Sequence, residues 1–82
     1  MVTVMAEVKE DKLLDARNLA CPMPVIKTKK ALKELESGQV LHVIATDPGS
    51  VNDFESWTRS TGNELLLSKQ EGKEYHFWIK KK

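Results

Sequence analysis

The stretch from residue 14 to residue 25 reads Leu14-Asp15-Ala16-Arg17-Asn18-Leu19-Ala20-Cys21-Pro22-Met23-Pro24-Val25, and it contains the only cysteine of the 82-residue chain. Pro22 and Pro24 lack a backbone N–H. The N–H groups of a first helical turn have no intrahelical partner, so both prolines are compatible with a helix start. The stretch therefore predicts that a helix begins directly after Cys21.

A cysteine at a helix N-terminus lies near the partial positive charge of the helix dipole, which favours the thiolate. We expect a moderately lowered pKa for the Cys21 thiol, because the prolines remove two N–H donors that could face the sulfur. A thiol with a pKa close to the ambient pH is the best attacker in sulfur exchange. The alternative for a lone cysteine is a small buried hydrophobic side chain. The flanking prolines favour the reactive thiol.

Length, charge and cysteine content limit the classes of protein to which this chain can belong. A chain of 82 residues with formal net charge +1 predicts one domain and argues against a wholly basic nucleic-acid binder, so direct nucleic-acid binding is not expected. No stretch has the length of a membrane span, and residues 1–11 lack a basic start and a long apolar run, so we expect a cytoplasmic protein. One cysteine cannot form an internal disulfide. Any chemistry at Cys21 therefore passes to or from another molecule.

The periodicity of apolar residues predicts the order of elements. Residues 1–11 are interpreted as an N-terminal extension, in preference to an extra edge strand, and residues 12–82 as a single domain. Residues 12–17 predict a first strand, and Asn18 a turn that tolerates a left-handed backbone. Residues 22–36 predict an amphipathic helix that ends at Ser37-Gly38, and residues 39–46 predict a second strand. Strand, helix and strand in this order predict a parallel pair.

The second half of the chain predicts a helix and a hairpin. Asp47-Pro48-Gly49-Ser50 is a turn, and Ser50 with Asp53 resembles a capping box that opens a helix ending near Gly62. Its buried stripe would contain Val51, Phe54 and either Trp57 or Thr58. Residues 63–70 and 73–80 predict two hairpin strands. The predicted fold class is α/β: a two-layer βαβαββ sandwich with a mixed four-stranded sheet and two helices on one face.

Three groups of residues carry a family resemblance: Leu14-Asp15-Ala16-Arg17, then Cys21-Pro22-Met23-Pro24 before a helix, then Asp47-Pro48-Gly49-Ser50 before a second helix. They resemble the TusA/SirA family of small sulfur carriers, which includes the YedF-like proteins, over about residues 12–80. Within the resemblance, Cys21 is the persulfide site, Pro22 and Pro24 match the motif prolines, and Asp15 matches the acidic residue upstream. Many members have glycine where this chain has Asn18.

The resemblance implies a cytoplasmic carrier that accepts sulfane sulfur as a persulfide, commonly from a cysteine desulfurase, and passes it to an acceptor protein. In the best-known branch the sulfur reaches thiolated tRNA, and other branches serve sulfur oxidation, molybdenum-cofactor supply or selenium metabolism. No metal or organic cofactor is required. The donor enzyme would supply the catalysis, which makes the chain a carrier that acts with an enzyme.

Charged residues near Cys21 suggest supporting roles. Asp15 could hydrogen-bond the backbone of the loop before Cys21 or orient a partner. Arg17 and the helix lysines could form a positive rim that attracts acidic partners, with an ordinary solvated helix face as the alternative. These lysines are Lys27, Lys29, Lys30 and Lys33. The loop of residues 47–50 is interpreted as a helix cap near Cys21, although a helix N-terminus can also hold an anion.

Two histidines are assigned to the sheet face away from the helices. Strand alternation places His42 with Val40 and Ile44, and His76 with Trp78. A Cys/His hydrolase or a metal site is therefore not expected, since neither ligand spacing nor an orienting group is visible. Two other functions stay open: a regulatory or RNA-binding interaction module in which Cys21 is incidental, and a thiol redox sensor.

Overall fold

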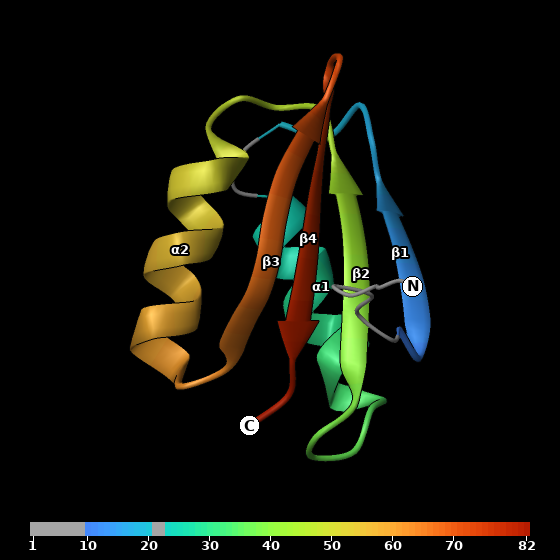
Figure 1. Cartoon of the computed structure of the whole chain (residues 1–82), viewed down its shortest axis with the longest axis vertical. Helices are drawn as coiled ribbons and strands as arrows, with labels where there is room; N and C mark the ends of the chain where they lie inside the picture. Colours follow the sequence, from blue (N-terminus) through green and yellow to red (C-terminus); the bar gives the residue numbers. More distant parts are fainter. Residues whose placement is uncertain (1–9, 21–22) are drawn as a thin grey trace, which may run out of the picture.

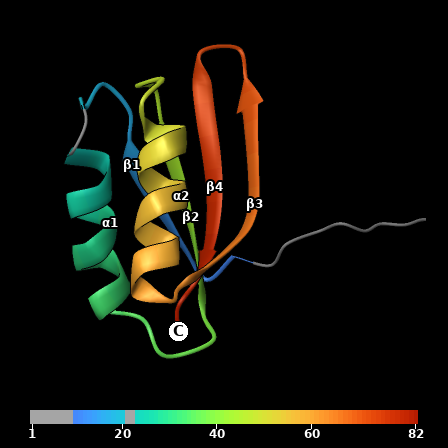
Figure 2. The ribbon, with the colours of Figure 1, turned by 90° about the vertical axis from the view of Figure 1, so that its left-hand side faces the viewer.

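The computed structural model describes residues 10–20 and 23–82 as a two-layer α/β sandwich. The elements are β1 (Lys12–Ala16), α1 (Met23–Lys33), β2 (Val40–Ala45), α2 (Ser50–Thr61), β3 (Glu64–Glu71) and β4 (Glu74–Lys80). The strand order is β1-β2-β4-β3, with β1 parallel to β2 and the other pairs antiparallel. Figure 2 shows α1 and α2 together on one face of the sheet. The predicted fold class is confirmed.

Some predictions concern positions that lie outside the described residues. These positions are Cys21, Pro22 and residues 1–9 of the N-terminal extension. The described chain begins at Glu10, and the backbone N–H of Asp11 donates to the carbonyl of Val40 at 2.8 Å. No helix among the described residues is long and apolar enough to cross a membrane.

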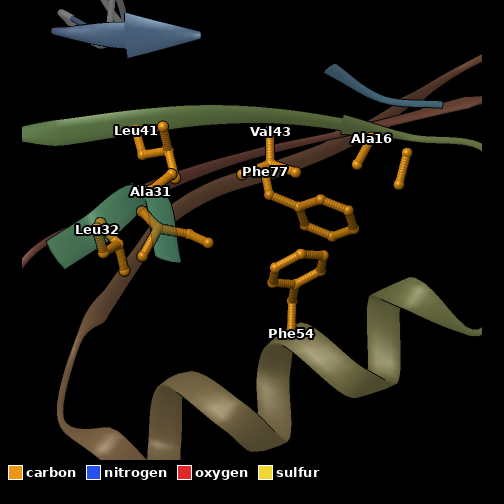
Figure 3. Close-up of a cluster of buried hydrophobic side chains, with 9 residues drawn as sticks. Ala16, Ala31, Leu32, Leu41, Val43, Phe54 and Phe77 are labelled. Atoms are coloured by element: carbon orange, nitrogen blue, oxygen red, sulfur yellow. The ribbon is translucent and has the colours of Figure 1, made fainter. Parts of the chain in front are cut away.

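The core lies between the sheet and the two helices. Phe54 of α2 and Phe77 of β4 are fully buried, with ring centroids 4.5 Å apart, and Figure 3 shows the two rings facing each other. The buried hydrophobic residues around them are Ala16, Ala31, Leu32, Leu41, Val43, Ala45 and Ile79. Alternation along β2 and β4 leaves their other side chains on the sheet face without helices, which we call the open face.

Helix α1 ends at Lys33, so the prediction that it continues to Ser37-Gly38 was wrong. The N–H groups of Glu34 and Leu35 bond to carbonyls three residues earlier, at 3.1 and 3.0 Å, which tightens the last turn. Gly38 has a φ of +90° and donates its N–H to the carbonyl of Lys81 at 2.8 Å. Gly38 therefore forms a turn whose backbone is hydrogen-bonded to the C-terminal segment.

The capping box predicted for α2 is also absent. Gly49 occupies the N-cap position, and within residues 10–20 and 23–82 no side chain forms a capping hydrogen bond. Ser50 is the first helical residue, and its buried Oγ has no hydrogen-bond partner among the residues that the structure describes. Asp47 shapes the turn instead: its Oδ1 accepts the N–H of Gly49 at 3.1 Å, and its carbonyl accepts the N–H of Ser50 at 2.9 Å. The predicted end at Gly62 is confirmed, with a φ of +85°.

Candidate functional site

The loops that follow β1 and β2 lie at the same end of the sheet, because the two strands are parallel. The N–H of Asn18 donates to Thr46 Oγ1 at 2.9 Å and so joins the segment leading to Cys21 to the loop of residues 46–49. Asn18 has a φ of +67°, the left-handed conformation expected for it. Asn18 therefore adopts the left-handed backbone geometry that a glycine would adopt at this turn.

Asp15 and Arg17 form a compact pair at the end of β1. Asp15 Oδ1 accepts the backbone N–H of Arg17 at 3.1 Å and its Nε at 2.9 Å, and Oδ2 accepts Nη2 at 3.0 Å. These hydrogen bonds lower the pKa of Asp15 to about 2 and raise that of Arg17. Asp15 therefore bonds the loop backbone, as one of its two predicted roles requires.

Arg17 does not join the helix lysines in one positive rim. Its Nη1 lies 3.4 Å from Glu74 Oε2, and Glu74 belongs to the same face of β4 as His76 and Trp78. Helix α1 covers the opposite face. The contact with Glu74 could not be found from the sequence, since 57 residues separate the two side chains.

The start of α1 is fixed by buried and bonded groups. The N–H of Met23 donates to the carbonyl of Ala20 at 2.8 Å. Pro24 is buried, and its carbonyl accepts the hydroxyl of the fully buried Thr28 at 2.8 Å. Met23 and Ile26 are each 41% exposed. The helix turn that follows Cys21 in the sequence thus has a firmly packed inner side and an apolar outer side.

The four lysines of α1 are all exposed, but they belong to two different surfaces. Lys29 and Lys33 line a cavity of about 260 Å³ between α1 and α2, whereas Lys27 and Lys30 do not. The other lining residues are Leu32, Trp57, Thr61, Asn63 and Lys81. Within residues 10–20 and 23–82, neither Lys29 nor Lys33 forms an ion pair. The cavity combines an apolar floor with ammonium groups, a combination that suits an acidic segment carrying an apolar side chain.

The two histidines lie on the open face, as predicted, and they contact each other. His42 Nε2 and His76 Nδ1 are 2.9 Å apart, and the His42 ring stacks on Trp78 with centroids 4.2 Å apart. A carboxylate lies at each end of the histidine pair: Glu10 is 2.9 Å from His42, and Glu74 is 3.3 Å from His76. Burial lowers the pKa of His42. In the described part of the chain, no three His, Cys, Asp or Glu side chains are arranged to hold a metal ion.

Comparison with known proteins gives the family. The model of the family described as "Sulfurtransferase TusA" matches residues 12–81, which include every strand and helix of the described structure. The chain belongs to the TusA family. The match spans β1, the segment with Cys21 and both helices.

Similar proteins agree with this assignment. The "Sulfur carrier protein TusA" of Allochromatium vinosum is 59% identical over 71 residues, which cover 87% of this chain and 93% of that protein. The "Putative sulfur carrier protein YrkI" of Bacillus subtilis is 56% identical over 73 residues, 89% of this chain and 97% of that protein. A crystal structure of a SirA-like protein from Desulfitobacterium hafniense superposes with a TM-score of 0.74 at 28% identity, covering 84% of this chain and 95% of that chain.

Proposed function

We propose that this TusA-family chain is a sulfur carrier that holds sulfane sulfur as a persulfide on Cys21 and relays it to an acceptor protein. The observation that carries the proposal is the position of Cys21. It is the only cysteine of the chain, it lies within the segment that the family model matches, and it precedes α1 by two residues. The names of the similar proteins as sulfur carriers support the same role.

The proposed transfer is a thiolate exchange without a net change of oxidation state. The Cys21 thiolate attacks the outer sulfur of a donor persulfide, a new S–S bond forms, and the donor cysteine leaves as a thiolate. An acceptor thiolate then attacks the terminal sulfur of Cys21, which becomes a thiolate again. A cysteine desulfurase or another sulfurtransferase fits the donor chemistry, and the reaction would take place in the cytoplasm. Thiolation of tRNA or another sulfur-transfer pathway would use the sulfur.

The described residues on either side of Cys21 in the sequence suggest how its loop is supported. Asp15 and Asn18 hold the incoming loop through Arg17 and Thr46, and Pro24 anchors the helix after it. The exposed Met23 and Ile26 offer an apolar contact to a partner in the first turn of α1. We assign the docking of an acidic partner surface chiefly to Lys29 and Lys33, because they border the cavity between α1 and α2.

Intact-protein mass spectrometry after incubation with a cysteine desulfurase and cysteine tests the carrier role. We expect the mass of one sulfur atom to be gained, to be lost on reduction, and to be absent in Cys21→Ser. No gain with several donors, while the thiol is reduced and can be alkylated, would contradict the proposal. RNA binding that survives Cys21→Ser and weakens steeply with salt would favour the interaction module.

The docking assignment has its own matched pair of variants. Lys29→Glu with Lys33→Glu changes the charge as much as Lys27→Glu with Lys30→Glu, but only the first pair changes the cavity lining. We expect the first pair to slow persulfide formation by roughly tenfold and the second by much less, since complementary charge acts mainly on association. Equal slowing by both pairs would indicate a general effect of net charge.

A further inference from the structure

Two largely buried histidines form a pair on the open face, and carboxylates face the outer nitrogens of both rings. His42 Nε2 and His76 Nδ1 are 2.9 Å apart. His42 Nδ1 lies 2.9 Å from Glu10 Oε1. His76 Nε2 lies 3.3 Å from Glu74 Oε1 and 3.6 Å from Glu71 Oε1. Each of the four ring nitrogens therefore faces either a carboxylate or the other ring.

The number of protons on this pair follows from its four nitrogens. Two neutral imidazoles carry two N–H groups and two lone pairs. The bond between the rings uses one of each, so a neutral pair directs one N–H and one lone pair at the carboxylates. One added proton gives an N–H at both ends and keeps the bond between the rings. A second added proton would set N–H against N–H across 2.9 Å. The observed arrangement therefore matches a pair with one added proton.

The carboxylates at the His76 end are each held by a cation. Glu74 Oε2 lies 3.4 Å from Arg17 Nη1, and Glu71 Oε2 lies 2.9 Å from Lys69 Nζ. A lone pair on His76 Nε2 would face both of these anions, so a neutral pair keeps its outer N–H at this end. The lone pair of the neutral pair then lies at the other end, on His42 Nδ1.

Glu10 is the carboxylate at the His42 end, and it lies in the segment before β1. Its Oε1 accepts the indole N–H of Trp78 at 3.2 Å. His42 Nδ1 is buried and forms no hydrogen bond within the described residues, although Glu10 Oε1 is 2.9 Å away. The attraction between them therefore depends on charge. Within residues 10–20 and 23–82, the Glu10 side chain has no partner besides His42 and Trp78.

We infer that His42 and His76 bind one added proton as a pair, and that this proton holds Glu10 on the open face. The proton comes from solvent and occupies His42 Nδ1, while the proton between the rings moves from His42 Nε2 to His76 Nδ1. His76 then carries the charge. Burial lowers the pKa of His42, which favours this distribution. When the pair loses the proton, His42 Nδ1 presents a lone pair and repels Glu10.

The contact of Glu10 is thus present in the protonated pair and is lost as the pH rises. Histidine changes its charge between about pH 5 and pH 8, so the contact responds within that range. Asp11 stays in place because its N–H donates to the carbonyl of Val40 at 2.8 Å, so release moves Glu10 and leaves β1 intact. Release uncovers the indole N–H of Trp78. The inference is independent of the proposed sulfur chemistry, since α1 and α2 cover the opposite face of the sheet.

NMR of the nitrogen-15-labelled full chain between about pH 9 and pH 5 tests the inference. Long-range proton–nitrogen correlations distinguish the two neutral tautomers of imidazole from the charged ring. We expect the pair to take up one proton, with His42 changing from the Nε2–H to the Nδ1–H tautomer and His76 becoming charged. The indole N–H resonance of Trp78 should shift with the same midpoint, and the heteronuclear NOE of Glu10 should fall as the pH rises.

Two variants separate the effect of Glu10 from that of the ring pair. Glu10→Gln should lower the proton affinity of the pair by about two- to fivefold, because it removes the anion beside His42. The matched control Glu55→Gln removes the same charge from an exposed position on α2 and should leave that affinity unchanged. His76→Asn offers His42 Nε2 an amide N–H, so His42 should keep the Nδ1–H tautomer and Glu10 should stay bound at the higher pH.

Three results would overturn the inference. They are a His42 tautomer that does not change across the titration, a pair that takes up two protons or none, and a proton affinity that Glu10→Gln leaves unchanged. Glu10 has a side chain that is 40% exposed, so its variant keeps the test open even where His76→Asn fails to fold. Circular dichroism establishes whether each variant is folded.

Discussion

Replacing Ser50 with alanine should increase the free energy of unfolding. Ser50 is 1% exposed, and its Oγ has no hydrogen-bond partner within the described structure. Burying a hydroxyl without a partner costs about 1–3 kcal/mol. Removing the oxygen leaves a small space that offsets part of this gain. We therefore expect a net stabilisation of about 0.5–2 kcal/mol.

The sign of this change separates two accounts of the α2 start. If Ser50 were an N-cap, as the sequence motif predicts, the same substitution would destabilise the protein by about 0.5–2 kcal/mol. The structure instead assigns the N-cap to Gly49 and the turn to Asp47. The two accounts differ in direction, which is easier to measure than a difference in size.

Urea unfolding followed by circular dichroism provides the measurement, with the free energy compared at equal m-value. Thr28→Val is the matched control, because Thr28 is also fully buried but its hydroxyl donates to the carbonyl of Pro24 at 2.8 Å. Loss of this hydrogen bond in Thr28→Val should destabilise the protein by about 0.5–1.5 kcal/mol. A destabilisation of more than about 0.5 kcal/mol by Ser50→Ala would refute the reasoning about an unpartnered hydroxyl.

Three further substitutions test other parts of the structure. Gly62→Ala should lower the free energy of unfolding by about 1 kcal/mol, because φ is +85° and a Cβ would lie 3.0 Å from Lys82 Cδ; urea unfolding with no change would contradict the left-handed cap. Burial lowers the pKa of His42, so the stability it contributes is present above about pH 6.5 and is lost on acidification; His42→Phe should flatten the unfolding free energy between about pH 7 and pH 5. The pKa of Asp15 is about 2, so Asp15→Asn should be less stable than the parent at neutral pH, with a gap that closes as the pH falls through about 2. A gap that does not change with pH would show that the pair with Arg17 is not its source.

The order and type of the elements could be predicted because their signals are local. Pro22 and Pro24 mark a helix start, and Gly62 marks a helix end that the structure confirms. Alternation along residues 74–80 places Phe77 in the core and Trp78 on the open face, as observed. Predicted boundaries failed where a distant segment intervened, as at Gly38, whose N–H bonds to Lys81.

The candidate site likewise has features that the local sequence predicts and features that only the tertiary structure sets. The sequence alone determined Cys21, the prolines beside it, the lysines of α1 and the turn at Asn18, since each depends on neighbours within a few positions. Tertiary structure alone decided that Arg17 meets Glu74, that Lys29 and Lys33 share a cavity with Trp57, and that His42 contacts His76. Those relations depend on strand register and helix packing, which are set by the burial of side chains far apart in the chain.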